Sequence, residues 1–362
     1  YLKHIDGIRA IAVFSIVFFH TGFEFFQGGY VGVDIFFVIS GFLITRWIVT
    51  KIERNNFSLK EFFSRRIKRL MPVLFFVKFL ILIFGYLIMS PYQFFSLVKQ
   101  LIYSTFFLSN IYLWKNSDYF SVNTFENPIV HTWSLSLEEQ FYLFFPLLII
   151  LVINLFNKNY LFLILIVFSI LSLFLAQFGG NLNFNKPYIE ENILFFNQPF
   201  FASYFMPFGR VWEFLFGSIL FLAKDNLENI LNKKKLLFSI IGFLFIIIPI
   251  FIYDESYLFP SFYTLIPVIG TSLLIVTYDI KNYIFRILSS KYFVFTGLIS
   301  YSFYLWHQPL FAFYKIYFFE DIKTQGIVLL LVVSYLLSIL TYKFIERPVR
   351  NKYKNNNLVI II

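Results

Sequence analysis

The sequence predicts an all-α integral membrane protein, built as a bundle of about ten transmembrane helices. Hydrophobic residues make up 59% of its 362 residues and charged residues only 14%, whereas a soluble domain is about one-quarter charged. The apolar residues gather into blocks long enough to cross a bilayer as helices. These blocks are apolar on all faces. They are also longer than the strands of a transmembrane β-barrel, which have about ten residues of alternating polarity, so the sequence favours helices.

Ten apolar segments account for the predicted helices, and the basic residues between them set their orientation. The segments are 8–23, 33–50, 73–90, 133–155, 160–178, 201–223, 236–253, 261–278, 292–317 and 326–345. If the N-terminus lies inside, 22 of the 30 Lys and Arg residues fall in inside segments and 4 in outside segments. Because Lys and Arg concentrate on the cytoplasmic side, both ends of the bundle are expected to be cytoplasmic. The formal charge of +10 is thereby explained by the bilayer, and no nucleic-acid partner is expected.

Two connections between the segments are expected to lie outside. The stretch 101–114 is apolar but short, and counting it as a crossing would place the cluster Lys233–Lys235 on the outer side. Segment 91–131 is therefore predicted to be an outside segment with a re-entrant or interfacial piece. The segment 179–198, with its Gly and Pro residues, is a second outer loop.

Ionisable residues inside the apolar segments mark a candidate site. Such groups are costly in a bilayer and indicate function by default. A helix rises about 1.5 Å per residue, so His20 lies roughly 16 Å further along its helix than Arg9. The same arithmetic places several groups from separate helices in the outer half of the bundle: His20, Asp34, Glu138 or Glu139, and His307. Four arginines lie at the inner end: Arg9, Arg46, Arg66 and Arg69.

Structural explanations exist for each of these residues. His20 could be a packing histidine and Asp34 a helix cap, while the arginines of the first inside loop could serve only to set topology. Arg210 and Glu213 are three residues apart, and this spacing favours a structural ion pair within the membrane. The convergence of several costly groups at one depth favours function. The chain has no Cys, which excludes disulfides, thiolate metal sites and a Cys acyl-intermediate, and no metal site is expected.

Seven motifs in order resemble the acyltransferase-three family of integral membrane O-acyltransferases. They are HIDGIRAIAV with the following His20, GGYVGVDIFFVISGFLIT, RRIKRLMP, HTWSLSLEEQFYLFFP, GRVWEFLFG, SYSFYLWHQPL and FIERPVR. They extend along nearly the whole chain. Their forms look most like the branch that modifies lipopolysaccharide O-antigen or peptidoglycan.

The resemblance implies a function and assigns roles. The chain is expected to move an acetyl group from cytoplasmic acetyl-CoA, a co-substrate rather than a bound cofactor, to a hydroxyl of an extracytoplasmic surface glycan. Its expected place is the bacterial cytoplasmic (inner) membrane, as a multi-pass protein. His20 matches the essential histidine, and Arg66 and Arg69, with Arg9, match the arginines thought to serve coenzyme A. The expected supporting or acceptor-side residues are Glu139, Tyr304, His307, Arg210 and Glu213.

The chemistry of the residues agrees with these roles. Guanidinium groups suit phosphate oxygens, and a neutral imidazole can take the proton of an attacking hydroxyl. Asp34 or Glu138 is expected to orient His20, as the acid does in a hydrolase triad. A covalent acyl-His or acyl-Ser relay and a direct transfer both remain open. The alternatives are a transporter or flippase without transfer chemistry, whose polar residues would form a path, and a scaffold that anchors a partner.

The C-terminal end carries a separate expectation. Residues 1–356 are expected to form the acyltransferase domain, and the apolar residues 358–362 directly follow a strongly polar run. We interpret 357–362 as the start of an eleventh transmembrane helix that leads to an extracytoplasmic, SGNH-like domain of the same chain. The bland alternative is a short hydrophobic end lying on the membrane.

Overall fold

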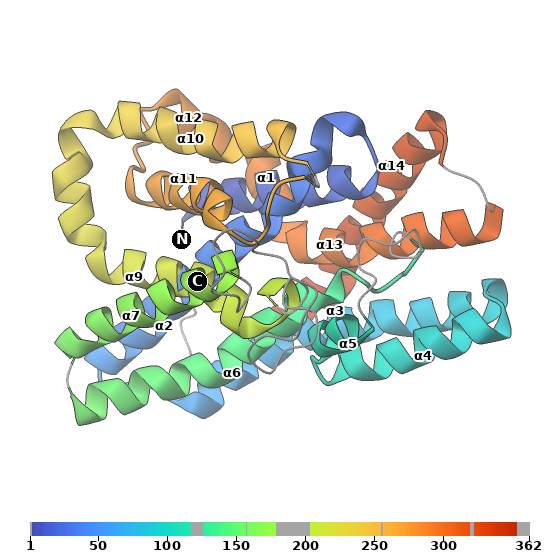
Figure 1. Ribbon diagram of the computed structural model, residues 1–362, viewed down its shortest axis with the longest axis horizontal. Helices are drawn as coiled ribbons and strands as arrows, with labels where there is room; N and C mark the ends of the chain where they lie inside the picture. The colour runs from blue at the N-terminus through green and yellow to red at the C-terminus, as the bar shows by residue number, and fades with distance from the viewer. Residues whose placement is uncertain are drawn as a thin grey trace.

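The computed structural model describes residues 2–116, 126–156, 158–178, 203–254, 256–318 and 322–352, and within these ranges its regular structure is helical, without strands. Most helices lie side by side along the long axis of the molecule (Figure 1). The N-terminal half holds α1 (Lys3–His20), η1 (Glu24–Val31), α2 (Gly32–Glu53), α3 (Leu59–Ile88), α4 (Pro91–Thr105), α5 (Ser109–Lys115), α6 (Thr132–Leu155) and α7 (Lys158–Phe178). The remainder holds α9 (Pro207–Leu231), η3 (Asn232–Lys234), α10 (Lys235–Ile252), η4 (Phe262–Thr264), α11 (Leu265–Val276), α12 (Tyr283–Leu288), α13 (Lys291–Phe318), α14 (Thr324–Thr341), the π-turn η5 (Tyr342–Glu346) and α15 (Arg347–Lys352).

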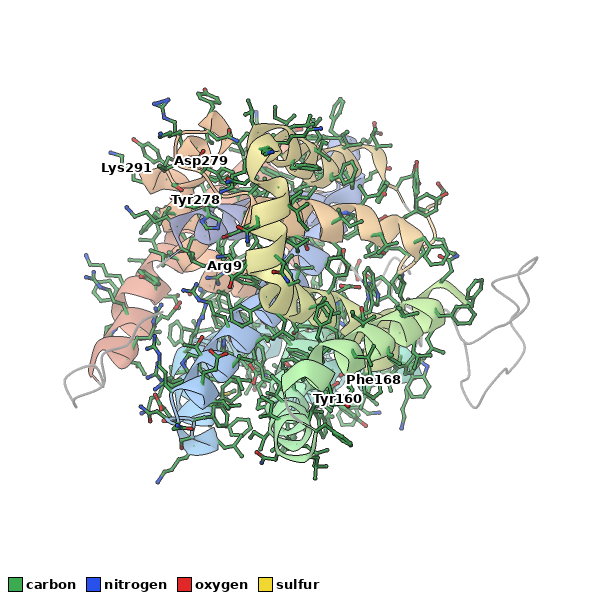
Figure 2. The ribbon with its side chains drawn as sticks, turned by 90° about the vertical axis from the view of Figure 1, so that its left-hand side faces the viewer. Arg9, Tyr160, Phe168, Tyr278, Asp279 and Lys291 are labelled. Atoms are coloured by element: carbon green, nitrogen blue, oxygen red, sulfur yellow. The ribbon has the colours of Figure 1, made fainter. Side chains whose placement is uncertain are left out.

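Each of the ten predicted segments overlaps a helix of the described residues. Six helical segments of the described residues are long and apolar enough to cross a membrane by length and composition. The chain is therefore a multi-pass membrane protein. Large apolar side chains such as Tyr160 and Phe168 of α7 are about half exposed, which suits a surface that faces lipid rather than water (Figure 2).

Several boundaries differ from the prediction. Helix α1 ends at His20, whereas the apolar run continues to residue 23. Helix α3 begins at Leu59, because the Ser58 side chain accepts a hydrogen bond from the Glu61 backbone and caps it. The basic motif RRIKRL was predicted to lie in a loop and lies inside this helix.

The predicted re-entrant piece is a pair of helices. Ser90 and Gln93 form a capping box that starts α4 with Pro91 in its first turn. The chain then turns at Phe107, whose φ is 56°, into α5. Ser109 of α5 donates its backbone N–H to the Ser136 Oγ, and its hydroxyl bonds to that of Thr132, so this segment packs against α6 of the bundle. The second predicted outer loop, 179–198, and residues 357–362 lie outside the described residues.

Helices α2 and α9 pack closely and run parallel. A Cβ on Gly41 would lie 1.9 Å from the Phe214 carbonyl oxygen, and one on Gly217 would lie 2.0 Å from the Val38 carbonyl oxygen. Small residues let membrane helices approach in this way. The close contact brings Asp34, near the start of α2, against the start of α9.

Helices α1 and α13 also run parallel and contact each other along their length. A Cβ on Gly297 would lie 1.9 Å from the Asp6 carbonyl oxygen, while at the other end His20 meets His307. The two imidazoles therefore reach one end of the bundle together. Arg9 and the start of α13 share the opposite end.

Candidate active site

A cavity of about 80 Å³ lies between α1, α2, α3, α6 and α13. Its lining combines apolar side chains, most of them from α2, with polar groups from all five helices. The polar lining residues are Arg9, Ser40, Arg66, Arg69, Ser134, Glu138, Tyr142, Ser300, Tyr301 and Tyr304. A concave, largely apolar space with few converging polar groups is typical of a small-molecule site.

Three arginines give the cavity positive charge. Arg9 donates to Asp6 over 3.3 Å, and the Arg66 guanidinium stacks 4.6 Å from the centre of the Tyr142 ring. Arg66 and Arg69 share a face of α3 because they are three residues apart. The Arg69 Nε is buried and has no hydrogen-bond partner among the described residues. A buried guanidinium donor without a partner is costly, so this Nε–H is available to an anionic ligand.

A compact hydrogen-bond network occupies the cavity wall formed by α2 and α6. Ser40 and Tyr142 both donate to the Glu138 carboxylate, and the Tyr142 hydroxyl also lies 3.1 Å from the Ser40 Oγ. Tyr142 follows Glu138 by four residues, so one turn of α6 places both on the same face. The network holds the Glu138 carboxylate through two hydroxyl donors.

A pair of imidazoles lies at the far end of α1 and α13. The His20 Nδ1 is 2.9 Å from the Ile16 carbonyl oxygen and 3.3 Å from the His307 Nε2. A carbonyl oxygen only accepts, so the proton of the neutral His20 ring resides on Nδ1. This tautomer leaves the His20 Nε2 with its lone pair. His20 is half-buried and His307 is fully buried.

Tyr304 separates this imidazole pair from the cavity. Its hydroxyl donates to the His131 carbonyl oxygen over 2.8 Å and lies 2.7 Å from the Ser134 Oγ. Its ring contacts those of His131 and His307, with centroid distances of 5.2 and 5.4 Å. His131 and His307 also contact each other, at 5.3 Å. Tyr304 therefore lines the cavity and also contacts two histidines, His131 and His307.

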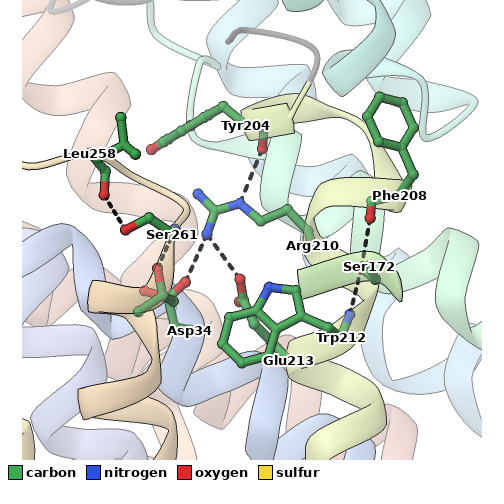
Figure 3. Close-up of polar contacts among 10 residues, drawn as sticks. Asp34, Ser172, Tyr204, Phe208, Arg210, Trp212, Glu213, Leu258 and Ser261 are labelled. Atoms are coloured by element: carbon green, nitrogen blue, oxygen red, sulfur yellow. Dashed lines mark hydrogen bonds and ion pairs between the residues drawn. The ribbon is translucent and has the colours of Figure 1, made fainter. Parts of the chain in front are cut away.

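A buried ion cluster joins α2 to α9 (Figure 3). The Arg210 Nη1 lies 2.8 Å from the Asp34 Oδ1 and 3.1 Å from the Glu213 Oε1, and the Arg210 Nε donates to the Tyr204 carbonyl oxygen. All three charged side chains are at most 1% exposed. The guanidinium also faces the rings of Trp133, Tyr204 and Phe259. This cluster ties the two helices together.

Comparison with known proteins places this arrangement in a family. The profile described as "Acyltransferase domain" matches residues 2–343. The chain belongs to the acyltransferase-three family. It is 32% identical over 369 residues to the O-acetyltransferase OatA of Staphylococcus aureus (strain NCTC 8325 / PS 47), covering 97% of this chain and 58% of that protein. A putative O-acetyltransferase of S. aureus (strain COL) is 30% identical with the same coverage. The chain thus spans little more than half the length of these relatives, and no solved structure matches it.

The structure brings some predicted residues of this acyltransferase-three chain together and separates others. Arg9, Arg66, Arg69 and Glu138 line one cavity, and His307 contacts His20. The expectation that Asp34 or Glu138 orients His20 is wrong. Asp34 binds Arg210, Glu138 binds Ser40 and Tyr142, and the imidazole is held by Ile16 and His307. The predicted contact between Arg210 and Glu213 is present. The Oε1 of Glu139, next to Glu138, is buried and has no hydrogen-bond partner in the part of the chain that the structure describes.

The sequence analysis missed His131, Ser134, Ser40 and Tyr142. His131 stands immediately before the predicted fourth span, so an inspection of residues inside apolar runs passes over it. The sequence did carry a usable signal. His131 and Ser134 are three residues apart, and both lie at the same end of the helix as Glu138. Ser40 lies within an apolar run, and a single hydroxyl there does not by itself indicate a functional site.

Proposed function

We propose that this protein is a membrane O-acetyltransferase that moves an acetyl group from cytoplasmic acetyl-CoA to a hydroxyl of an extracytoplasmic surface glycan, such as O-antigen or peptidoglycan. The observation that carries the proposal is a cavity lined by three arginines, from α1 and α3, beside a pair of imidazoles at the far end of α1 and α13. The names of the relatives support acetyl transfer to oxygen.

The arginine end of the cavity suits the donor. Coenzyme A carries phosphates, and guanidinium forks bind phosphate oxygens through charge-assisted hydrogen bonds. The Arg69 Nε, which lacks a partner among the described residues, is available for such a bond. The excess of basic residues in the predicted inside segments supports a cytoplasmic position for this end, on the same side of the inner membrane as cytoplasmic acetyl-CoA. The acyl end would then point into the bundle, toward Tyr304.

The imidazole end suits the acceptor. The His20 Nε2 carries a lone pair and can take the proton of a sugar hydroxyl as its oxygen attacks the thioester carbon. The His20 Nδ1–H already faces two acceptors, the Ile16 carbonyl and the His307 Nε2. Both contacts strengthen when the ring becomes an imidazolium, so His307 takes the part that a carboxylate takes in a hydrolase triad.

The decisive experiment measures acetyl transfer by the purified protein in proteoliposomes. Released coenzyme A is followed with a thiol reagent, which gives no protein background because the chain has no Cys. Acetylated glycan is measured in cells that make equal amounts of each variant. His20→Ala is expected to abolish both signals. His4→Ala is the matched control, because His4 lies on the same helix but is stacked on Tyr278, away from the cavity.

Two results would count against the proposal. Full glycan acetylation by the His20→Ala protein would show that His20 is not the catalytic base. Passage of a glycan or acyl group across the vesicle membrane without any coenzyme A release would favour a transporter.

A further inference from the structure

The motif FIERPVR, at 344–350, directly follows α14 and spans the end of the π-turn η5 and the start of α15. Pro348 favours this irregular turn, because a proline inside a regular α-helix lacks an N–H and clashes with the carbonyl four residues before it. Turns of this kind are frequent at functional sites. Glu346, the last residue of the turn, is only 1% exposed. The motif therefore contributes a buried carboxylate to the bundle.

Glu346 links the arginine end of the cavity to a fourth arginine. Its Oε1 lies 3.3 Å from the Arg350 Nη1, and its Oε2 accepts a hydrogen bond from the Ser302 Oγ over 3.4 Å. Ser302 directly follows Tyr301, which lines the cavity. The carboxylate also interacts electrostatically with Arg69 of the cavity. One buried carboxylate thus lies between the cavity and Arg350.

Arg350 lies on the inner side of Glu346 in the predicted orientation of the bundle. Helix α14 runs from the outer side to the inner side, and four further helical residues add roughly 6 Å toward the cytoplasm. Helix α15 packs against α3, which carries Arg66 and Arg69. The Arg350 side chain is 28% exposed, against 13% for that of Arg9. Arg350 is therefore an accessible guanidinium at the inner edge of the arginine end.

Coenzyme A carries phosphate at two separate places. Its pyrophosphate joins the pantetheine arm to the nucleotide, and another phosphate is attached to the ribose 3′-oxygen, further from the thioester. When the thioester points into the bundle, the 3′-phosphate is the phosphate nearest the cytoplasm. The cavity arginines are then placed for the pyrophosphate, and Arg350 is placed for the 3′-phosphate.

We propose that Arg350 binds the 3′-phosphate of the coenzyme A donor, and that Glu346 is a positioning residue that orients the Arg350 guanidinium. The inference rests on the proposed acetyl transfer and adds a residue that distinguishes coenzyme A from donors without this phosphate. A guanidinium forms charge-assisted bonds to phosphate oxygens. The Glu346 contact uses one of its N–H donors and leaves others for a ligand.

A role in setting the topology does not by itself explain this pair. An arginine that only orients a helix can stay in solvent, as Arg347 does one turn earlier on the same helix. Arg350 is instead held by a carboxylate that is 1% exposed and costs free energy to bury. A buried partner that fixes a more accessible guanidinium pre-organises that guanidinium for an anionic ligand.

The test compares acetyl-CoA with acetyl-3′-dephospho-CoA, which lacks only the 3′-phosphate. The dissociation constant of each donor is measured by isothermal titration calorimetry with the intact protein in detergent, so no acceptor is needed. Arg350→Gln removes the proposed phosphate contact. Arg347→Gln is the matched control, because it removes the same charge from an exposed position on the same helix.

The parent protein is expected to bind acetyl-CoA about 10-fold more tightly than the dephospho donor, near the lower end for a hydrogen bond to a charged group because water screens Arg350. Arg350→Gln should abolish this preference without weakening dephospho-donor binding, and Arg347→Gln should retain it. Glu346→Gln should reduce the preference, whereas a merely structural Glu346 would affect both donors equally. If Arg350→Gln does not fold, the double variant with Glu346→Gln decides the question, because it leaves no unpaired carboxylate.

Two results would overturn the inference. One is a parent protein that binds both donors equally, and the other is a preference for acetyl-CoA that survives in the folded Arg350 variant or falls equally in the Arg347 control. Failure of the parent protein to bind either donor would instead refute the proposed function.

Discussion

Replacing Arg210 by Gln tests the interpretation that Asp34 has a structural role and is not part of the active site. Arg210 makes two ion pairs and one hydrogen bond to a carbonyl, and it is 1% exposed. Without the guanidinium, the Asp34 and Glu213 carboxylates face each other in a site that excludes water. Removing one partner of a buried ion pair costs about 3–5 kcal/mol, because an uncompensated charge remains.

The same helix offers a matched control. Lys224 and Glu228 form an ion pair at 3.0 Å, also within one turn of α9, but both side chains are about one-third exposed. Solvent screens such a pair, so Lys224→Gln should cost only about 0.2–1 kcal/mol. Both variants remove an ion pair within one turn of α9, but Arg210 is buried and also pairs with Asp34 of α2, whereas Lys224 pairs with Glu228 at the surface.

The assay is the free energy of unfolding in a denaturant titration of the detergent-solubilised protein, with each variant compared at equal detergent. Arg210→Gln is expected to lower the stability several-fold more than Lys224→Gln. Combining Arg210→Met with Asp34→Asn and Glu213→Gln should restore much of the loss, since no buried charge then remains. A loss for Arg210→Gln no larger than that for Lys224→Gln would refute the structural reading of the cluster.

Three further predictions concern the donor, the imidazole pair and the helix contact. Arg69→Ala should weaken acetyl-CoA binding by about 1.5–3 kcal/mol, as expected for a lost charge-assisted phosphate contact; titration of acetyl-CoA checks this, and an unchanged affinity would leave Arg69 a topology determinant. His307→Ala and His20→Ala should be strongly non-additive in a double-mutant cycle of acetyl transfer, because the rings act as one unit; additive losses would separate them. Gly217→Ala should destabilise the protein by about 1–3 kcal/mol in a thermal unfolding assay, because its Cβ would lie 2.0 Å from a backbone carbonyl. Gly326→Ala is the control and should be tolerated, because the nearest neighbour of its Cβ is the Ile322 side chain.

The helices could be predicted from the sequence because the bilayer dictates their length and polarity. Each apolar run corresponds to a helix, and the relative direction of α1 and α13 follows from the count of crossings between them. The prediction that His20 and His307 share one end of the bundle rested on this count, and the structure places the two rings in contact.

The partners of the buried charges could not be predicted in the same way. Hydropathy gives the depth of a residue along the membrane normal but not the face of the helix on which its neighbour lies. Asp34 was expected near His20 because the two share a depth. The close approach of α2 and α9 at Gly41 and Gly217 instead turns Asp34 toward Arg210. A glycine that permits a close contact reveals nothing in one sequence about which helix makes that contact.

Helices α1 and α13 carry residues from both ends of the proposed site. Helix α1 carries Arg9 and His20, and α13 carries Tyr304 and His307, so two parallel helices hold the donor end and the acceptor end. The rise of about 1.5 Å per residue fixes the span from Arg9 to His20 at roughly 16 Å. The Asp6 backbone approaches Gly297 closely, so the two helices pack tightly near the arginine end. In the proposed reaction, an acyl group that enters from the arginine end reaches His20 past Tyr304, which lines the cavity and contacts His307.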